Sequence, residues 1–551
     1  MTRAKDSDGF NAWAPGLSSD IPARLMPLVT LYRPENSTVD YPSAKEAAAF
    51  CGLKPQDMVA FTPERLVKHA LLIRVTADLS VPDGPNYEEL GLNLRGMVAR
   101  IYDGYAAPEM AMFTEALAEL RETGRQVMTD CLAEVTAPKG EAPAKPSLMG
   151  RLFGGKAEPP APAPTDLDVL GRLEALRRKE TAPVRAAAQD ALITILGGIL
   201  RVHGRLVPDT DLMIGFALNM FANKQGALEV DQRIAPIMTR AAKAVGYRVL
   251  PSQDKPFFMN VKGASASGKS TIRPQQRALA DKLGIPWDDF ALISPDYWRK
   301  YLADYESLGE DFKYAAMLTG QELEIIDKKL DVYVEEKAGR QGVPHLLIDR
   351  FRFDSFSTNR EGKISSRLLT RFGDTVFLFF LVTPPAATVE RAWARGLETG
   401  RFKAVDDLLY HNIEAYTGMP QLFFSWIGAS DKKIHFEFLD NSVPKGQRPR
   451  TIAYGWNDRM VVLDVEGLHN IDRYRAVNVA ADRPEDVLEA APELTFVDRC
   501  VAHFDVLTVL DAGSEAVARM AREGVWLDQV EADYPPKGQR DEDASLTLGD
   551  W

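Results

Sequence analysis

The stretch "GASASGKST" at residues 263–271 combines small residues with one lysine and two terminal hydroxyls at a spacing that suits phosphate binding. Glycine lets the backbone curl so that N–H groups can point at phosphate oxygens, which larger side chains would obstruct. Lys269 would bring a positive charge to the β and γ phosphates, and Ser270 would offer its hydroxyl to Mg²⁺. The stretch predicts a site for ATP and Mg²⁺ made by Gly263, Ala264, Ser265, Ala266, Ser267, Gly268, Lys269, Ser270 and Thr271.

The flanking residues supply the elements that such a loop needs. The apolar run "PFFMNV" (256–261) predicts a buried strand before it, and residues 270–284 predict a helix after it, whose positive N-terminus would face the anion. Pro274 removes one hydrogen bond from the first turns of that helix and should bend them. A phosphate-binding loop alone does not separate a kinase from a motor or a switch.

Phosphoryl transfer also needs a base for the accepting hydroxyl and arginines over the spreading charge. Asp296 follows the run "FALIS" (290–294), which we place beside strand 256–261, so its side chain should emerge at the carboxyl edge of the sheet. The alternative is that Asp296 only caps the helix at 297–305. The candidate arginines are Arg391, Arg395 and Arg401, although the first two could instead pair with Glu390 or Glu398.

Asp349 ends the run "HLLID" (345–349) and could hold Mg²⁺ together with Ser270, or could cap the following turn. The aromatic stretch at 410–426 could stack a nucleotide base, but such stretches more often form core.

The layout of residues 292–308, 319–353, 381–402 and 436–442 resembles the zeta-toxin family of P-loop kinases over about 255–445. The resemblance implies that Asp296 is the general base and that UDP-N-acetylglucosamine or a related sugar nucleotide is the acceptor. It also implies a lid whose arginines hold the transferring phosphate. The resemblance implies roles for further residues: catalysis for Arg391, Arg401 and Lys269, nucleotide binding for Asn441, and substrate binding for Glu324, Asp349, Arg352 and Arg395. The segment "DRFRFDSF" (349–356) departs from the family pattern, which implies a reshaped acceptor pocket.

Around this core the chain is expected to divide into several parts. Five apolar runs separated by helical stretches predict an α/β P-loop kinase core with a parallel sheet, which we bound at 251–445. Amphipathic patterns predict helices at 86–135 and 167–249. Beyond 446 we expect a strand at 460–465 and helices near 484–491 and 513–523. The other predicted parts are a helical N-terminal region (1–135), a Pro/Ala-rich linker (136–166), a second helical region (167–250) and a small acidic α/β extension (446–551).

Composition narrows the range of partners. A formal net charge of −12 disfavours nucleic acid and favours a small-molecule acceptor. Three scattered cysteines, no histidine metal spacing and no run of about 18 apolar residues predict a cytoplasmic protein without a membrane segment. The helical N-terminal region is a candidate for binding a protein partner or for intramolecular regulation.

The function predicted from these observations is an ATP-dependent kinase acting on a small-molecule hydroxyl. Two alternatives stay open at this point. One is a nucleotide-dependent regulatory protein with little turnover, and the other is a polynucleotide 5′-kinase, which the acidic balance disfavours.

Overall fold

The computed structural model describes residues 9–84, 88–138, 164–350, 369–489, 492–511, 516–530 and 536–551. The chain forms two compact units, which we call unit 1 (1–23, 72–98 and 245–551) and unit 2 (24–71 and 99–244). Most of the predicted linker 136–166 lies outside the described residues. The division differs from the expected domains, because two N-terminal segments belong with the sheet and residues 446–551 do not separate from 251–445.

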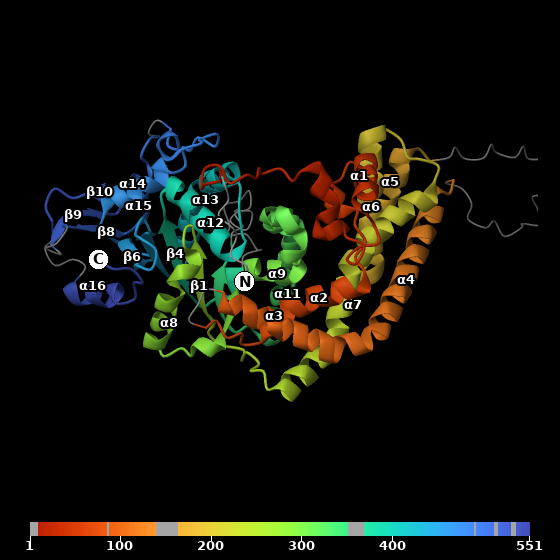
Figure 1. The fold of residues 1–551 in the computed structure, drawn as a ribbon, viewed down its shortest axis with the longest axis horizontal. Coiled ribbons are helices and arrows are strands. Elements are labelled where there is room, and N and C mark those ends of the chain that lie inside the picture. Colours follow the sequence, from red (N-terminus) through yellow and green to blue (C-terminus); the bar gives the residue numbers. More distant parts are fainter. Residues whose placement is uncertain are drawn as a thin grey trace, which may run out of the picture. The chain divides into compact units, whose positions relative to one another are not determined.

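Unit 1 is built on one ten-stranded mixed sheet (Figure 1). Its strands are β1 (Phe257–Lys262), β2 (Phe290–Ile293), β3 (His345–Asp349), β4 (Thr375–Val382), β5 (Lys433–Asp440), β6 (Arg450–Trp456), β7 (Arg459–Val462), β8 (Val506–Leu510), β9 (Val517–Arg522) and β10 (Val525–Trp526). Their order is β10-β9-β8-β7-β6-β5-β4-β1-β3-β2. The neighbouring pairs among β1–β5 are all parallel, as are β7 and β8, and the other pairs are antiparallel.

The expected α/β core with parallel strands is confirmed in this form. Each of the five apolar runs becomes a strand, and β1, β2 and β3 are buried along their whole length, as strands covered on both faces must be. The expected placement of "FALIS" is wrong: β1 pairs with β3 and β4, while β2 pairs with β3 at the edge. The order of the strands in the sequence did not reveal that β3 lies between β1 and β2 in the sheet.

The part of the chain after 446 extends the same sheet. The expected strand at 460–465 corresponds to β7, but the helix expected at 513–523 is wrong, because 517–522 form β9. Residues 484–486 form only one 3₁₀ turn. In β9 the apolar residues Met520 and Ala521 are buried side by side, so neither a helical nor an alternating pattern marks the segment.

The helices of unit 1 are α8 (Arg273–Lys282), α9 (Arg299–Leu302), α10 (Ala315–Leu318), α11 (Gly320–Gln341), α12 (Pro385–Thr399), α13 (Val405–Ile427), α14 (Val465–Arg473), α15 (Phe496–His503) and α16 (Lys537–Ala544). Two 3₁₀ segments matter for the site: η6 (Lys269–Ile272) and η8 (Pro295–Trp298). Pro274 stands in the first turn of α8, where its missing N–H costs little, and the preceding turn is 3₁₀.

Unit 2 is helical. The elements that contribute to it are α1 (Tyr41–Cys51), α2 (Pro63–Asp78), α3 (Glu89–Ile101), α4 (Met110–Thr136), α5 (Asp166–Lys179), α6 (Pro183–His203) and α7 (Thr210–Val245); the unit boundaries cut α2 and α3. Helices α4, α5 and α6 pack on one another, and α1 packs on α6. Within the described residues, α6 is the one helix that matches a membrane span in length and apolar composition, and 56% of that window is buried inside the protein.

Residues near the C-terminus are tied to the middle of the sheet by a buried carboxylate. Glu437 of β5 accepts hydrogen bonds from the N–H groups of Leu548 (2.7 Å) and Gly549 (3.0 Å), and from the Thr451 hydroxyl (2.7 Å). Burial raises the pKa of Glu437 to about 7, although these donors oppose the shift. The carboxyl group therefore holds a proton in the folded protein at pH values where the unfolded chain has lost it.

This pKa makes a prediction about stability. Between about pH 4.5 and pH 7 the folded state binds one more proton than the unfolded state at Glu437, so the free energy of unfolding should fall as pH rises through this window. In Glu437→Gln that part of the pH dependence should disappear, and the Tm profile between pH 5 and 7.5 should be flatter by about 2 °C or more. The exposed Glu310 provides the control substitution Glu310→Gln, which should keep the wild-type slope. A Glu437→Gln profile parallel to that of the wild type would contradict the prediction.

Candidate functional site

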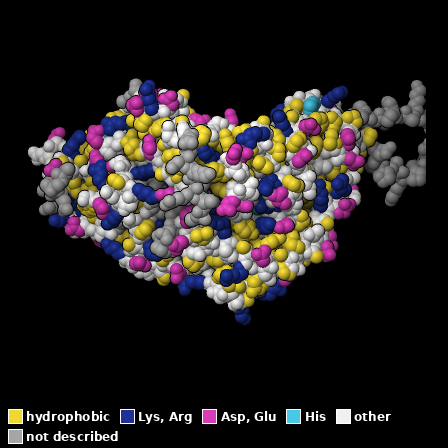
Figure 2. All heavy atoms as spheres, in the orientation of Figure 1, with side chains coloured by type: hydrophobic (Ala, Val, Ile, Leu, Met, Phe, Trp, Pro, Cys, Tyr) yellow, Lys and Arg dark blue, Asp and Glu magenta, His cyan; other side chains and the backbone are white. Residues whose placement is uncertain are grey.

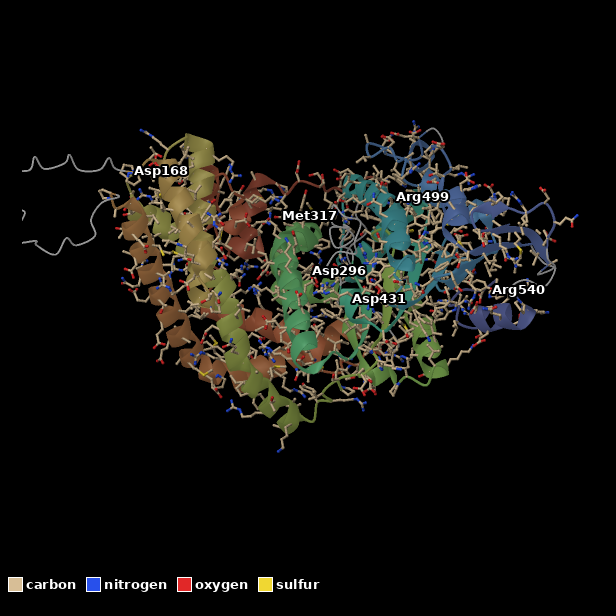
Figure 3. All side chains as sticks on the ribbon, turned by 180° about the vertical axis from the view of Figure 1, so that it is seen from behind. Asp168, Asp296, Met317, Asp431, Arg499 and Arg540 are labelled. Atoms are coloured by element: carbon tan, nitrogen blue, oxygen red, sulfur yellow. The ribbon has the colours of Figure 1, made fainter. Side chains whose placement is uncertain are left out.

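One cavity of about 1050 Å³ lies in unit 1, at the carboxyl edge of the parallel strands. The loop after β1, the turn after β2, the end of β3, helix α12 after β4 and the turn after β5 all contribute to its wall. Asp296 and Met317, both labelled in Figure 3, belong to the lining. Ligands of open α/β sheets bind at this edge, because the loops that leave the strands converge there.

The loop at 263–271 is held in an unusual conformation. Gly268 has a φ of 96°, and Ala266 takes a left-handed φ of 61°, which is uncommon for a residue with a side chain. A Cβ at Gly268 would lie 2.3 Å from the side-chain nitrogen of Asn441, and one at Gly263 would lie 2.5 Å from the Ser267 hydroxyl oxygen. Close contacts therefore favour glycine at both positions, and backbone shape favours it at Gly268 as well. Strain of this kind concentrates at functional sites.

The orientation of the Ser267 peptide is fixed from outside the loop. Its carbonyl oxygen accepts hydrogen bonds from Asn441 Nδ2 (2.6 Å), Thr383 Oγ1 (3.1 Å) and Arg391 Nη1 (3.4 Å). Thr383 follows β4, Asn441 follows β5 and Arg391 lies in α12, so two strand ends and one helix share one acceptor. The loop geometry thus depends on residues more than 100 positions further along the chain.

Lys269 lies over the start of the loop. Its ammonium donates to the carbonyls of Ala264 (2.8 Å) and Gly263 (3.1 Å), and burial together with Arg401 and Arg395 lowers its pKa. The cation is therefore presented at the cavity by two backbone acceptors, which an incoming anion could supplement or replace.

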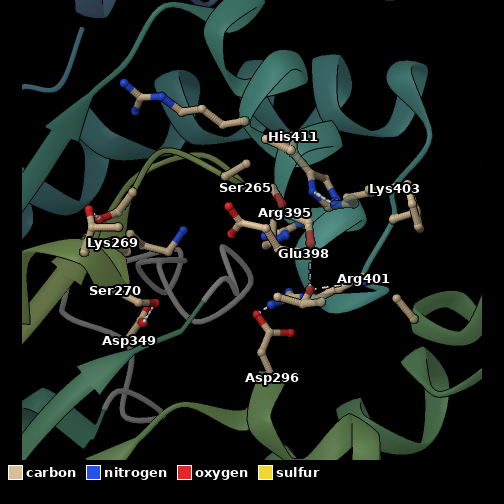
Figure 4. A pocket seen from close by; sticks show the side chains of 18 of the residues that line it. Ser265, Lys269, Ser270, Asp296, Asp349, Arg395, Glu398, Arg401, Lys403 and His411 are labelled. Atoms are coloured by element: carbon tan, nitrogen blue, oxygen red, sulfur yellow. Dashed lines mark hydrogen bonds and ion pairs between the residues drawn. The ribbon is translucent and has the colours of Figure 1, made fainter. Parts of the chain in front are cut away.

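Ser270 and Asp349 form the pair expected of a Mg²⁺ site. The Ser270 hydroxyl donates to Asp349 Oδ2 over 2.7 Å (Figure 4). Arg273 Nη2 lies 3.9 Å from the same oxygen. Within the described residues there is no group of three or more His, Cys, Asp or Glu side chains that could hold a metal. One hydroxyl and one carboxylate suit Mg²⁺, which usually keeps several waters and binds substrate phosphates.

Asp296 lies on the opposite wall in contact with two arginines. Its Oδ1 pairs with Arg299 Nε (3.0 Å) and its Oδ2 with Arg401 Nη2 (2.5 Å) (Figure 4). Burial alone would raise the pKa of Asp296, but Arg401 and Arg299 outweigh it and hold the pKa far below its usual range. The carboxylate makes no capping hydrogen bond in η8 or α9, so the alternative of a helix cap finds no contact here.

The three candidate arginines occupy different places. Arg401 contacts Asp296, and Arg395 lines the cavity. Arg391 donates to the carbonyls of Asn441 (2.7 Å) and Val443 (2.9 Å) as well as Ser267, so it braces the loop and the turn after β5. The proposed pairing with Glu390 or Glu398 is not what the structure shows for Arg391. Glu390 accepts from the Trp13 indole (2.9 Å) and Glu398 pairs with Lys445.

Some of the residues expected at the substrate line the cavity, and one lies outside the described residues. Glu324 lines the cavity and pairs with Lys328 one turn along α11. Beside it, Asp327 pairs with Arg350 over 3.0 Å. Arg352 lies outside the described residues. The aromatic stretch at 410–426 forms α13, in which Tyr416, Phe423 and Trp426 are buried in the core.

Three further residues that line the cavity, Lys403, Asp407 and His411, follow α12 and were not predicted from the sequence. Lys403 pairs with Asp407 over 3.1 Å and contacts the imidazole of His411. Burial lowers the pKa of Lys403 to about 8 and, with Lys403 itself, that of His411 to about 3. Asp407 and His411 lie four residues apart in α13 and share one face of it, while Lys403 precedes the helix; the four-residue spacing was present in the sequence.

Comparisons with known proteins leave the family open. No family model matches the chain, and no curated protein is a significant match. A search of solved structures finds a chain described under the molecular and structural characterization of the PezAT chromosomal toxin–antitoxin system of Streptococcus pneumoniae. The match is 14% identical, covers 38% of this chain and 77% of that chain, and has a TM-score of 0.25. A likeness at this level does not establish a shared fold or activity, so function must be argued from the cavity.

The contacts of Gly268 give a prediction about the loop. Gly268→Ala should weaken ATP binding about 10-fold or more, because the new methyl group would displace Asn441 from the Ser267 carbonyl. Gly284→Ala is the matched control, since Gly284 also has a positive φ (70°) but a Cβ added there would meet no heavy atom within 4 Å. Calorimetric titration with Mg²⁺-ATP measures both variants. Equal affinity in the two would show that the close contact with Asn441 does not shape the loop.

The pKa of Lys403 gives a prediction about pH. If the protonated amine attracts nucleotide phosphates, affinity for Mg²⁺-ATP should fall as pH rises from 7 to 9, and a single charge accounts for about a 10-fold change. Lys403→Met should remove most of that fall, while contributions from Lys269 and from the buried Lys262, whose pKa burial lowers to about 7, remain.

A pH-dependent loss of folding would not explain a fall in ATP affinity. Because the pKa of Lys403 is lower in the folded state, its contribution to the free energy of unfolding increases as pH rises from about 8 towards 10.5. The effect of Lys403 on stability therefore has the opposite sign to its expected effect on affinity. Lys445→Met removes an exposed lysine from the rim of the same cavity and should leave the pH slope unchanged. A Lys403→Met slope identical to the wild type would rule Lys403 out as a phosphate contact.

Proposed function

We propose that unit 1 is an ATP-dependent kinase that transfers the γ-phosphate to a hydroxyl group of a small molecule. The observation that carries the proposal is the shared cavity: the 263–271 loop, the Ser270–Asp349 pair, Asp296 and Arg401 all line one space. These are the parts that phosphoryl transfer requires, namely a phosphate-binding loop, oxygens for Mg²⁺, an acceptor for the hydroxyl proton and cations over the transferring group. The cavity is also larger than one nucleotide needs.

Each side chain has a role in this proposal. Lys269 would bind the β and γ phosphate oxygens, and Ser270 with Asp349 would hold Mg²⁺, which supplies charge neutralisation to the phosphates when bound. Arg391 would act by keeping the loop in shape, because its donors are engaged with backbone carbonyls. Arg395 and Arg401 would face the transferring phosphate.

Asp296 and Arg401 explain how the base could be activated. In their ion pair the carboxylate is a weak proton acceptor, because Arg401 and Arg299 stabilise its charged form. A γ-phosphate near Arg401 would compete for the guanidinium and loosen its contact with Asp296. The pKa of Asp296 would then rise, and the carboxylate could accept the proton of a substrate hydroxyl only when ATP is in place.

The acceptor side of the cavity points to a polar, hydroxyl-bearing molecule. Asp296, Glu324 and Asp327 supply carboxylates there, and Met317 and Leu323 supply apolar surface. Carboxylates accept hydrogen bonds from hydroxyl groups, as sugars require. A sugar nucleotide such as UDP-N-acetylglucosamine, implied by the resemblance in the sequence, is the first acceptor to test. Figure 2 shows lysine and arginine interspersed with acidic side chains on the visible face, which does not favour a polynucleotide.

The proposal predicts a separation of binding from catalysis. Asp296→Asn should reduce acceptor-dependent phosphorylation by about 10²–10⁴-fold, the usual cost of losing a general base, while ATP stays bound. The measurement uses γ-labelled ATP with UDP-N-acetylglucosamine and with a fractionated metabolite extract, and identifies the labelled product. Asp304→Asn, an exposed acid eight residues further along and outside the cavity lining, should behave as the wild type.

Two results would overturn the proposal. An Asp296→Asn rate within a few-fold of the wild type, with ATP affinity intact, would remove Asp296 as the base. ATP binding by the wild type without any labelled product, in the extract or alone, would instead favour the nucleotide-dependent regulatory protein.

A further inference from the structure

We infer that the segment Leu72–Val98, which is separated from the kinase core by about 150 residues of sequence, positions the proposed base Asp296. The segment belongs to unit 1 and includes the end of α2 and the beginning of α3. Its contacts converge on the residues that surround Asp296 in η8 and α9. Thr76 and Arg95 are therefore positioning residues, and the inference rests on the function proposed above.

The first contact involves a completely buried tryptophan. Trp298, two residues after Asp296, donates its indole N–H to the Thr76 hydroxyl oxygen over 3.1 Å, and both side chains are buried. The Thr76 hydroxyl donates its own proton to the Leu72 carbonyl oxygen over 2.7 Å. Its oxygen is thereby oriented to accept from the indole. Leaving a buried donor of this kind without its partner costs its desolvation free energy.

The second contact holds the residue next to Asp296. Arg95 Nη1 reaches the Tyr297 carbonyl at 3.4 Å, and Gly91 lies so close to the Tyr297 ring that a Cβ there would be 2.6 Å from a ring carbon. From the other side, Arg273 donates to the Tyr297 hydroxyl over 3.4 Å and lies 3.9 Å from Asp349. Tyr297 is thus held between the N-terminal segment and the helix that follows the phosphate-binding loop.

Further polar contacts anchor the segment to the same region. Glu88 accepts from Lys300 over 3.2 Å, and Asp83 pairs with Arg277 of α8. Asp78 accepts from Lys337 over 2.7 Å and from the Tyr333 hydroxyl, both on α11. Helix α11 carries Glu324 and Asp327 on the acceptor side of the cavity. The segment therefore touches α8, η8, α9 and α11, and the last three of these contribute residues to the cavity lining around Asp296.

These contacts matter because the turn that carries Asp296 is short. It follows β2, which is the edge strand of the sheet, and η8 and α9 are four residues each. Transfer requires Asp296 within hydrogen-bond reach of the acceptor hydroxyl, and misplacement by about 1 Å costs up to about 100-fold in rate. The segment adds fixed contacts to those that Arg273, Arg299 and Arg401 make with this short turn.

The test compares variants of the full chain. Thr76→Val keeps the side-chain shape but leaves the indole of Trp298 without its acceptor, and Arg95→Met removes the donor to Tyr297. Both should lower kcat for the labelled acceptor about 10-fold while KM for ATP stays within about twofold of the wild type. Thr76→Ser retains the hydroxyl and should restore kcat. Thr129→Val is the control, because Thr129 makes the same bond to its preceding turn (2.9 Å) on an exposed helix of unit 2.

The outcomes separate this inference from the proposed function. A kcat within twofold of the wild type in both Thr76→Val and Arg95→Met would overturn the inference, as would equal losses of kcat and ATP affinity without rescue by Thr76→Ser. A wild type with no transfer activity would overturn the proposed function. In that case amide hydrogen exchange in residues 295–302 decides the positioning alone: faster exchange in Thr76→Val than in Thr129→Val supports it, and equal exchange overturns it.

Discussion

The carbonyl oxygen of Ser267 is the acceptor on which the whole site depends. Three donors from α12, the end of β4 and the end of β5 meet at this one atom, and they fix the peptide that precedes Gly268. Because the loop carries strained residues, it needs such outside support to keep its shape. The parallel order of β1, β4 and β5 is what brings these donors together. The sheet thus serves the chemistry by setting the position of a single peptide group.

The residues of the loop and the apolar runs were readable from the sequence, since both are local patterns. Gly268, Lys269 and Ser270 stand next to one another in the chain, and each strand of the core is a continuous apolar run. The position of Asp296 at the carboxyl edge of the sheet could also be predicted, because the residue directly follows an apolar run. The strand that pairs with β2 could not be predicted, because the hydrophobic pattern carries no information about which buried strands pair.

Long-range contacts account for most of what the sequence did not reveal. Arg391 was expected at the phosphate, yet its donors are satisfied by carbonyls of residues that lie close only after β4 and β5 have paired. The role of Leu72–Val98 was hidden for the same reason, since Thr76 looks like an ordinary residue of an amphipathic helix until Trp298 is placed against it. The strand β9 was missed because its buried residues Met520 and Ala521 are adjacent, so the alternation typical of a strand is absent.

The distribution of unit 1 along the chain has a consequence for protein synthesis. All residues of unit 2 precede position 245, whereas unit 1 combines segments from near residue 9 with Leu548 and Gly549, whose N–H groups satisfy Glu437. On the ribosome, unit 2 can therefore close while the partners of Leu72–Val98 have yet to be made. Thr76 and Arg95 leave the ribosome more than 200 residues before Trp298 and Tyr297. A chain released before β5 is translated would lack Asn441, and with it one of the three donors that hold the Ser267 peptide in place.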